Sequence, residues 1–196
     1  MSLFRSARYI ASAHEQTELP PDIGHEIAFA GRSNAGKSSA INAITARRKL
    51  AFVSKTPGRT QTINFFDLGH DRRLVDLPGY GYASVSQAER AHWANLISGY
   101  LQQRDSLAGL VLIADARHAL KNLDLQLVGW YAPSGLPLLV LLTKADKLTQ
   151  RDAHANLERA RADLARIYPQ GAAQLFSATA GTGVPAAQKV LHGWLK

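Results

Sequence analysis

The sequence predicts an α/β fold in three layers: a mostly parallel sheet with one antiparallel edge strand, and helices on both faces. Continuous apolar runs over residues 107–114 and 138–143 are typical of strands buried on both faces of a parallel sheet. Helical patterns alternate with these runs along the chain. Gly69, His70 and Asp71 separate two further short runs, which indicates the antiparallel hairpin.

The elements follow in order. Residues 1–24 are polar and contain two prolines, so we expect an irregular N-terminal lead-in, followed by a single domain over residues 25–196. Strands are predicted over 26–30, over 63–68 and 73–77 as the hairpin, over the two long apolar runs, and over 174–177.

Helices are predicted between these strands, over residues 38–46, 152–167 and 185–195. A further helix is expected after Ser86, because Ser86 and Glu89 have the spacing of a capping box. Trp93, Leu96 and Tyr100 then recur at helical spacing and are expected to pack in the core.

The composition limits the possible functions. The chain has 196 residues, of which 46% are hydrophobic, and this favours one folded domain. It has no cysteine, which excludes disulfides, thiolate-bound zinc, iron–sulfur clusters and cysteine nucleophiles. The apolar runs are too short for a membrane span and no signal peptide is evident, so we expect a cytoplasmic protein.

A phosphate-binding loop follows the first predicted strand. Its glycines allow backbone conformations that point N–H groups inward, at the start of a helix, where phosphate oxygens bind. Lys37 would reach the β- and γ-phosphates, and Ser38 would bind Mg²⁺. The motif G-x-x-x-x-G-K-S consists of Gly31, Arg32, Ser33, Asn34, Ala35, Gly36, Lys37 and Ser38.

A D-x-x-G motif ends the second strand of the hairpin. Asp76 would hold Mg²⁺, and the N–H of Gly79 would approach a γ-phosphate closely, because glycine has no side chain. The nucleotide contacts expected here are Asp76, Leu77, Pro78 and Gly79.

A third motif predicts which base is bound. Thr143, Lys144, Ala145 and Asp146 follow a strand and resemble the [NT]-K-x-D motif of GTPases. A carboxylate at Asp146 can accept hydrogen bonds from N1–H and the N2 amino group of guanine, whereas adenine has no donors there. Phe176, Ser177 and Ala178 resemble the weaker fifth GTPase motif, in which the Ala178 N–H would donate to guanine O6.

The segment between the first two motifs is a candidate switch loop. A GTPase needs a threonine here that reaches Mg²⁺ when the γ-phosphate is present. Thr60 and Thr62 are both candidates, and Thr60 is favoured. The nucleotide contacts expected in this loop are Gly58, Arg59, Thr60, Gln61 and Thr62.

With these residues together, the chain resembles the translation-factor-related (TRAFAC) P-loop GTPases. It is most similar to the EngB/YsxC (YihA) family of bacterial ribosome-assembly GTPases, in long matched strings over residues 28–39, 55–66, 75–83 and 143–146. The resemblance covers nearly the whole chain. It departs at Ala40, where a larger aliphatic residue is usual.

The resemblance implies a Ras-like G domain that binds GTP and GDP with Mg²⁺. It further implies a switch that acts on the large (50S) ribosomal subunit, its rRNA and its proteins, during assembly, and that is needed for normal cell division and septation. Nothing in the sequence requires more than a monomer.

The site departs from many GTPases in the residue after D-x-x-G. Where a Gln often orients the attacking water, this chain has Tyr80, so slow intrinsic hydrolysis is expected. The catalytic set is then Lys37, Thr60, Gly79 and Asn34. The resemblance gives Asn34 a role in holding K⁺ in place of an arginine finger, and a hydrogen bond within the loop is the alternative.

Two other functions remain open at this point. One is a guanine-nucleotide-binding module that does not hydrolyse GTP, and the other is a P-loop kinase for a small molecule. The net charge of +8 favours a polyanionic partner. Seven of the basic residues lie within residues 47–73, around the candidate switch loop, a segment that is compatible with rRNA binding.

Overall fold

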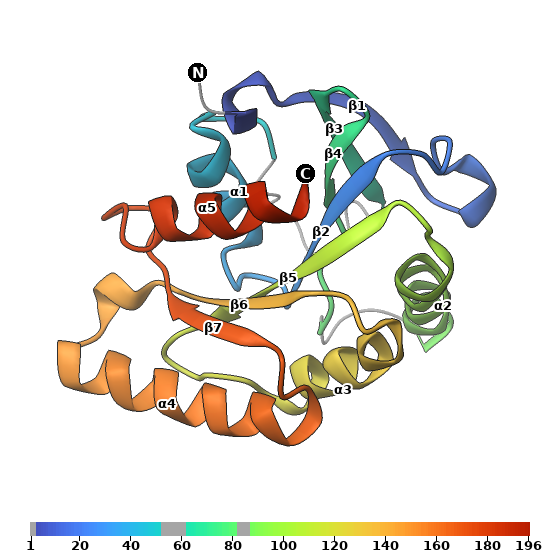
Figure 1. Cartoon of the computed structure of the whole chain (residues 1–196). Helices are drawn as coiled ribbons and strands as arrows, with labels where there is room; N and C mark the ends of the chain where they lie inside the picture. Colours follow the sequence, from blue (N-terminus) through green and yellow to red (C-terminus); the bar gives the residue numbers. More distant parts are fainter. Residues whose placement is uncertain (1–2, 52–61, 82–86) are drawn as a thin grey trace.

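A seven-stranded sheet forms the middle layer of the molecule (Figure 1). The structure is a computed structural model, which describes residues 3–51, 62–81 and 87–196. The strands are β1 (Arg8–Ala13), β2 (His25–Gly31), β3 (Ile63–Gly69), β4 (Arg72–Asp76), β5 (Leu107–Asp115), β6 (Leu138–Thr143) and β7 (Ala172–Leu175). Their order across the sheet is β1-β3-β4-β2-β5-β6-β7. The predicted α/β class is confirmed.

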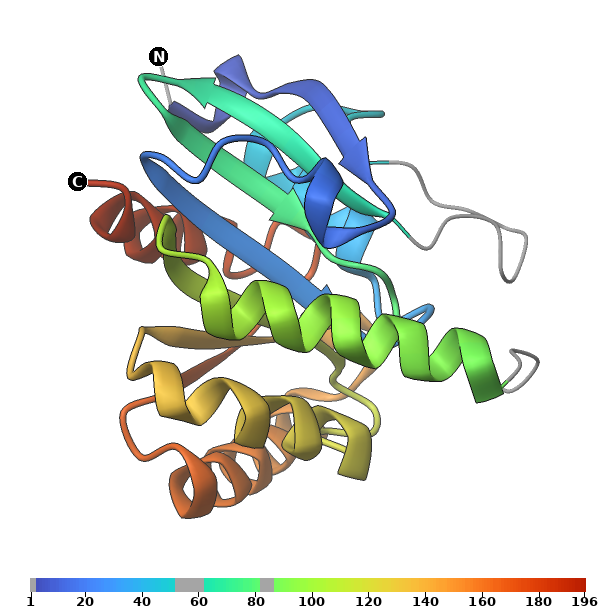
Figure 2. The same ribbon diagram turned by 90° about the vertical axis from the view of Figure 1, so that its right-hand side faces the viewer.

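Five α-helices among the described residues cover the sheet: α1 (Lys37–Thr45), α2 (Gln87–Gln103), α3 (Asn122–Tyr131), α4 (Gln150–Ile167) and α5 (Val184–Trp194). Figures 1 and 2 show α2, α3 and α4 on one face of the sheet, and α1 and α5 on the other. Each face has its own buried apolar cluster, which contains Leu96 and Leu127 on the first face and Ile41 and Leu191 on the second. No helix among the described residues is long and apolar enough to cross a membrane.

The central strands are parallel and fully covered. β2 pairs with β4 and β5, and β6 pairs with β5 and β7, all in parallel. Every residue of β6 is buried. This burial on both faces explains why the sequence of these strands is continuously apolar rather than alternating.

The predicted hairpin is present. β3 pairs antiparallel with β4, and the backbone turns through Gly69, His70 and Asp71, all at positive φ. Among the described strands, β3 alone runs against the others. It lies second from the edge of the sheet, because β1 pairs with it and forms the edge strand.

The N-terminal segment differs from the irregular lead-in that the sequence suggested. β1 pairs antiparallel with β3, with a register shift between Tyr9 and Ala11. Three of its six residues are exposed, two are partly buried, and only Ala13 is fully buried. A strand with so few buried positions lacks the apolar pattern that would reveal it.

Helix α3 is the second element that the sequence did not reveal. Leu123, Leu125 and Leu127 alternate with polar residues, a pattern more typical of a strand. The helix begins after Lys121, whose backbone N–H donates to Asp124 Oδ2 at 2.9 Å. The capping Ser86 proposed for α2 lies outside the described residues.

Candidate functional site

The phosphate-binding loop joins β2 to α1, as predicted. Gly31 ends β2, and a Cβ on it would lie 2.7 Å from the backbone oxygen of Ile113, so the neighbouring strand excludes any larger residue. Gly36 precedes α1 with φ of 98°, a conformation that favours glycine. The first N–H groups of α1 therefore point into the loop with the positive end of the helix dipole.

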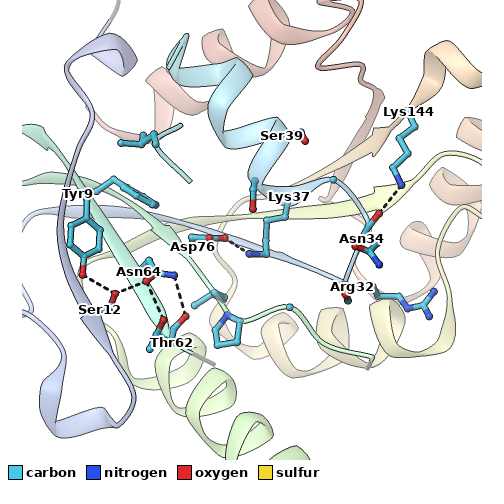
Figure 3. Close-up of a pocket in the computed structure, with 18 residues that line it drawn as sticks. Tyr9, Ser12, Arg32, Asn34, Lys37, Ser39, Thr62, Asn64, Asp76 and Lys144 are labelled. Atoms are coloured by element: carbon cyan, nitrogen blue, oxygen red, sulfur yellow. Dashed lines mark hydrogen bonds and ion pairs between the residues drawn. The ribbon is translucent and has the colours of Figure 1, made fainter. Parts of the chain in front are cut away.

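A cavity of about 610 Å³ opens beside this loop. Its size lies within the usual range for a small-molecule site. Figure 3 shows the residues that line it, which come from β1, β3, the phosphate-binding loop, α1 and the D-x-x-G segment. The predicted residues among them are Arg32, Ser33, Asn34, Gly36, Lys37, Ser38, Thr62, Asp76, Leu77, Pro78, Gly79 and Lys144.

Lys37 and Asp76 form an ion pair at the centre of the cavity (Figure 3). Their side chains are only 12% and 9% exposed, so the pair is largely shielded from water. The ammonium shows that Asp76 accepts a cation here, and Ser38 follows Lys37 in the first turn of α1. One hydroxyl and one carboxylate are hard oxygen donors that fit Mg²⁺, which takes its remaining ligands from phosphates and water.

Lys144 connects the phosphate-binding loop to the motif that follows β6. Its Nζ donates to the backbone oxygen of Asn34 at 2.6 Å and to Asp115 Oδ2 at 2.9 Å. Thr143 Oγ1 donates to the backbone oxygens of Ala35 and Ala114. The two loops are thus held together without any ligand.

Asp146 and Ser177 meet at the far end of this arrangement. Ser177 Oγ lies 2.6 Å from Asp146 Oδ1, and the backbone N–H of Ala145 donates to Phe176 O at 3.2 Å. The Ser177 hydrogen bond lowers the pKa of the Asp146 carboxyl most, and the backbone N–H of Asp146 and then the charge of Lys147 lower it further. Asp146 is therefore negatively charged at neutral pH, as acceptance of two N–H bonds requires.

The D-x-x-G segment is bonded to the phosphate-binding loop. The backbone N–H of Ser33 donates to Tyr80 O at 2.8 Å. The Tyr80 hydroxyl donates to Asp124 Oδ1 at 2.6 Å, which ties the segment to α3. Burial, and then the charge of Asp124, raises the pKa of Tyr80 well above its usual value. The Tyr80 side chain therefore packs within the protein.

The predicted switch loop is mostly outside the described residues, including Gly58, Arg59, Thr60 and Gln61. Thr62 is described: it is 2% exposed, and its hydroxyl donates to Asn64 Oδ1 at 3.1 Å. Arg73 of the basic segment 47–73 is buried and paired with Glu26, so it does not contribute to a basic surface.

The sequence did not identify the four cavity residues that come from β1 and β3, which are Tyr9, Ser12, Asn64 and Phe66. Ser12 Oγ donates to Asn64 Oδ1 at 2.6 Å, and the Tyr9 hydroxyl lies 2.9 Å from Ser12 Oγ. Asn64 falls within a matched string and could have been included. Tyr9 and Ser12 carry no local signal, because only the pairing of β1 with β3 brings them to the cavity.

Comparison with known proteins identifies the family. The protein-family model described as "50S ribosome-binding GTPase" matches residues 26–144 of this chain. The probable GTP-binding protein EngB of Methylobacillus flagellatus is 52% identical over 100% of this chain and 94% of its own length. That of Azoarcus is 55% identical, with the same coverage.

The chain belongs to the EngB family of GTP-binding proteins. The resemblance drawn from the motifs is thus confirmed, and the kinase alternative loses its support. A crystal structure of a probable EngB protein has the same fold, with a TM-score of 0.69 at 19% identity over 87% of this chain and 98% of that one. The crystal structure of Era in complex with MgGDPNP and a segment of 16S ribosomal RNA also has this fold. Its TM-score is 0.66 at 18% identity, and the match covers 88% of this chain and 57% of the Era chain.

Proposed function

We propose that this EngB protein is a slow, Mg²⁺-dependent GTPase that acts as a switch in assembly of the 50S subunit. It works in the cytoplasm as a monomer with one G domain over residues 25–196, and normal cell division and septation depend on it. The observation that carries the proposal is the link from Lys144 to Asn34. It holds a base-reading carboxylate, Asp146, at a fixed place relative to the phosphate-binding loop.

Each group at the site has a role suited to its chemistry. The N–H groups of residues 31–38 and the Lys37 ammonium bind the phosphates, and Lys37 leaves Asp76 when they enter. Asp146 accepts hydrogen bonds from guanine, and Ala178 N–H donates to its O6. The Mg²⁺ ligands proposed are Ser38, Asp76 and Thr60. A bound Mg²⁺ would neutralise charge on the β- and γ-phosphate oxygens.

Slow hydrolysis is proposed from the state of Tyr80. Its hydroxyl donates to Asp124, so it is not available to orient a water at the phosphates. Asn34 is at positive φ and its backbone oxygen accepts from Lys144, while its side chain is exposed. The Asn34 side chain remains the proposed K⁺ ligand, and equal hydrolysis rates in Na⁺ and K⁺ buffers would refute that role.

The position of Tyr80 also favours a second candidate function. Without a group to orient water, the protein could act as a guanine-nucleotide-binding module whose output is association alone. Single-turnover hydrolysis measured with and without 50S subunits separates the two functions. Acceleration by the subunits supports the GTPase, and no turnover in either condition supports the module.

Base recognition is tested by competition against fluorescent GDP. GTP should displace it and ATP should not, whereas Asp146→Asn should lose GDP affinity and gain affinity for xanthosine diphosphate, because the amide can donate to the xanthine O2. Glu158→Gln removes a negative charge from an exposed site on α4, and it should change neither the affinity for GDP nor the affinity for xanthosine diphosphate. Equal competition by ATP, or an Asp146→Asn protein that still prefers GDP, would overturn the assignment.

Ribosome association is tested by sedimentation with purified 50S subunits. The protein loaded with a non-hydrolysable GTP analogue should sediment with the subunits, and the GDP-loaded protein should do so less. Equal amounts in both nucleotide states, or none in either, would overturn the role as a switch.

A further inference from the structure

A second cavity, of about 280 Å³, lies against the same phosphate-binding loop. We call it the α3 cavity, because Lys121 and Asp124 at the start of α3 line it together with residues 32–35, the end of β5 and Lys144. Both cavities share Arg32, Ser33, Asn34 and Lys144, so the phosphate-binding loop and Lys144 form a wall of each. Figure 3 shows Arg32 pointing away from Lys37 and Asp76.

Positive charge exceeds negative charge around the α3 cavity. The cationic side chains are Arg32, Arg117, Lys121 and Lys144, and the acidic ones are Asp115 and Asp124. His118 lines the cavity as well. Asp115 is already paired, with Arg117 at 2.7 Å and Lys144 at 2.9 Å. Burial alone would raise the pKa of Asp115, but the bonds from Arg117 and Lys144 lower it, so it stays ionised.

Asp124 is occupied as well. One of its oxygens accepts from Tyr80 and the other from the backbone N–H of Lys121. The two remaining cations therefore have spare donors. Lys121 is exposed and makes no ion pair within the described part of the chain. Arg32 Nε is buried and, among the described residues, has no hydrogen-bond partner.

The backbone at Gly81 packs closely beside Arg32. A Cβ on Gly81 would come within 3.3 Å of Arg32 Nε and 3.5 Å of Leu123 Cδ1, so a side chain there would crowd the guanidinium. Gly81 has φ of 82°, so glycine is favoured for its backbone as well as for the space it leaves. A charged donor without an acceptor, in a polar cavity, favours an anionic oxygen as its partner.

We propose that the α3 cavity binds a backbone phosphate of RNA, with Arg32 and Lys121 as donors. The choice of RNA rests on the proposed function at the 50S subunit, and the net charge of +8 agrees with a polyanionic partner. The phosphates of GTP belong to the larger cavity, which contains Lys37 and Asp76. The α3 cavity can therefore hold RNA while the nucleotide is bound.

The test uses the whole protein, loaded with GDP and Mg²⁺, and a fluorescein-labelled RNA hairpin. Fluorescence anisotropy gives the Kd over a series of KCl concentrations. Lys121→Gln should weaken binding about tenfold and lower the slope of log K against log salt by about one. Lys189→Gln makes the same change at an exposed site on α5 and should have neither effect. GDP affinity should be unchanged in both variants.

Several results would overturn the proposal. They are a wild-type protein that does not bind the hairpin, Lys121→Gln binding with unchanged affinity and slope, or an equal loss in Lys189→Gln. If Lys121→Gln binds the hairpin normally but loses 50S subunits, the cavity contacts a protein instead. If the wild type ignores 50S subunits while hairpin binding depends on Lys121, the RNA site stands and the proposed ribosomal function fails.

Discussion

The side chain of Asp146 depends on one neutral donor for its orientation. Ser177 Oγ lies 2.6 Å from one carboxylate oxygen, while Lys147 lies 3.5 Å from the other and is 66% exposed. Ser177 also accepts a bond from the backbone N–H of Ala180 at 3.0 Å. A buried serine thus connects Asp146, the proposed base-reading carboxylate, to the loop that carries Ala178.

Ser177→Ala should weaken GDP binding about fivefold, the value of one ordinary hydrogen bond. The pKa of Asp146 is lowered chiefly by Ser177, and guanine requires the charged carboxylate. Affinity should therefore be full at neutral pH and fall as the pH drops through that pKa. In Ser177→Ala the pKa rises, so the fall should begin at a higher pH. GDP titrations across acidic pH test this, and an unchanged onset would contradict it.

Tyr80 and Asp124 are 44 residues apart and meet only in the folded chain. Tyr80→Phe removes the donor from a carboxylate that is 1% exposed, so the free energy of unfolding should fall by about 1–3 kcal/mol. Tyr9→Phe is the control, because Tyr9 is 55% exposed and its change should stay within about 0.5 kcal/mol. Urea denaturation measures both, and equal small effects would show that the Tyr80 bond contributes nothing.

At the scale of elements, the sequence predicted the strands whose residues are buried on both faces. It did not predict β1, which is held in the sheet by its pairing with β3, or helix α3. The buried runs of β5 and β6 and the motifs at the ends of β2, β4 and β6 were evident in the sequence. β1 was not, because Tyr9 and its neighbours are exposed. Helix α3 was not, because its leucines alternate. The bond of Tyr80 to Asp124 could not be predicted without α3.

Glu26 joins three elements at the start of β2. Its carboxylate is fully buried and accepts from Arg73 of β4, from Tyr100 of α2, and from Arg104 just beyond α2, at 2.8–2.9 Å. Burial, and then the charge of Glu26, raises the pKa of Tyr100 well above its usual value. The cluster places two guanidinium groups around one buried carboxylate, and Arg104 has a second, partly exposed partner in Asp22 at 3.3 Å.

Glu26→Gln should lower the free energy of unfolding by about 3–5 kcal/mol, because it removes the buried counter-charge of Arg73 and leaves Arg104 with Asp22 alone. Glu158→Gln removes an exposed carboxylate whose partner, Arg161, is 50% exposed, and should cost less than about 1 kcal/mol. Chemical denaturation of both variants measures the difference. If the Glu26→Gln protein is as stable as the Glu158→Gln protein, the charge of Glu26 does not contribute to the free energy of unfolding.

For the molecule as a whole, nucleotide binding and stability are linked through the Lys37–Asp76 pair. In the ligand-free chain the pair neutralises two largely buried charges. In the proposed function, the phosphates of the nucleotide take Lys37, and a cation is then needed at Asp76. A ligand that binds only the folded state stabilises that state by about 2.7 kcal/mol when the free ligand concentration is about 100 times Kd.

GDP with Mg²⁺ at that concentration should therefore raise the Tm by about 5–11 °C, since about 1 kcal/mol shifts a domain of this size by about 2–4 °C. The same GDP concentration with EDTA should give a smaller rise, because Asp76 then faces the phosphates without a cation. Asp76→Asn should show equal shifts with Mg²⁺ and with EDTA, and comparing shifts within each variant removes any change in its basal stability. A wild-type shift that is the same with Mg²⁺ and with EDTA would exclude Asp76 and Ser38 as the ligands of a required metal ion.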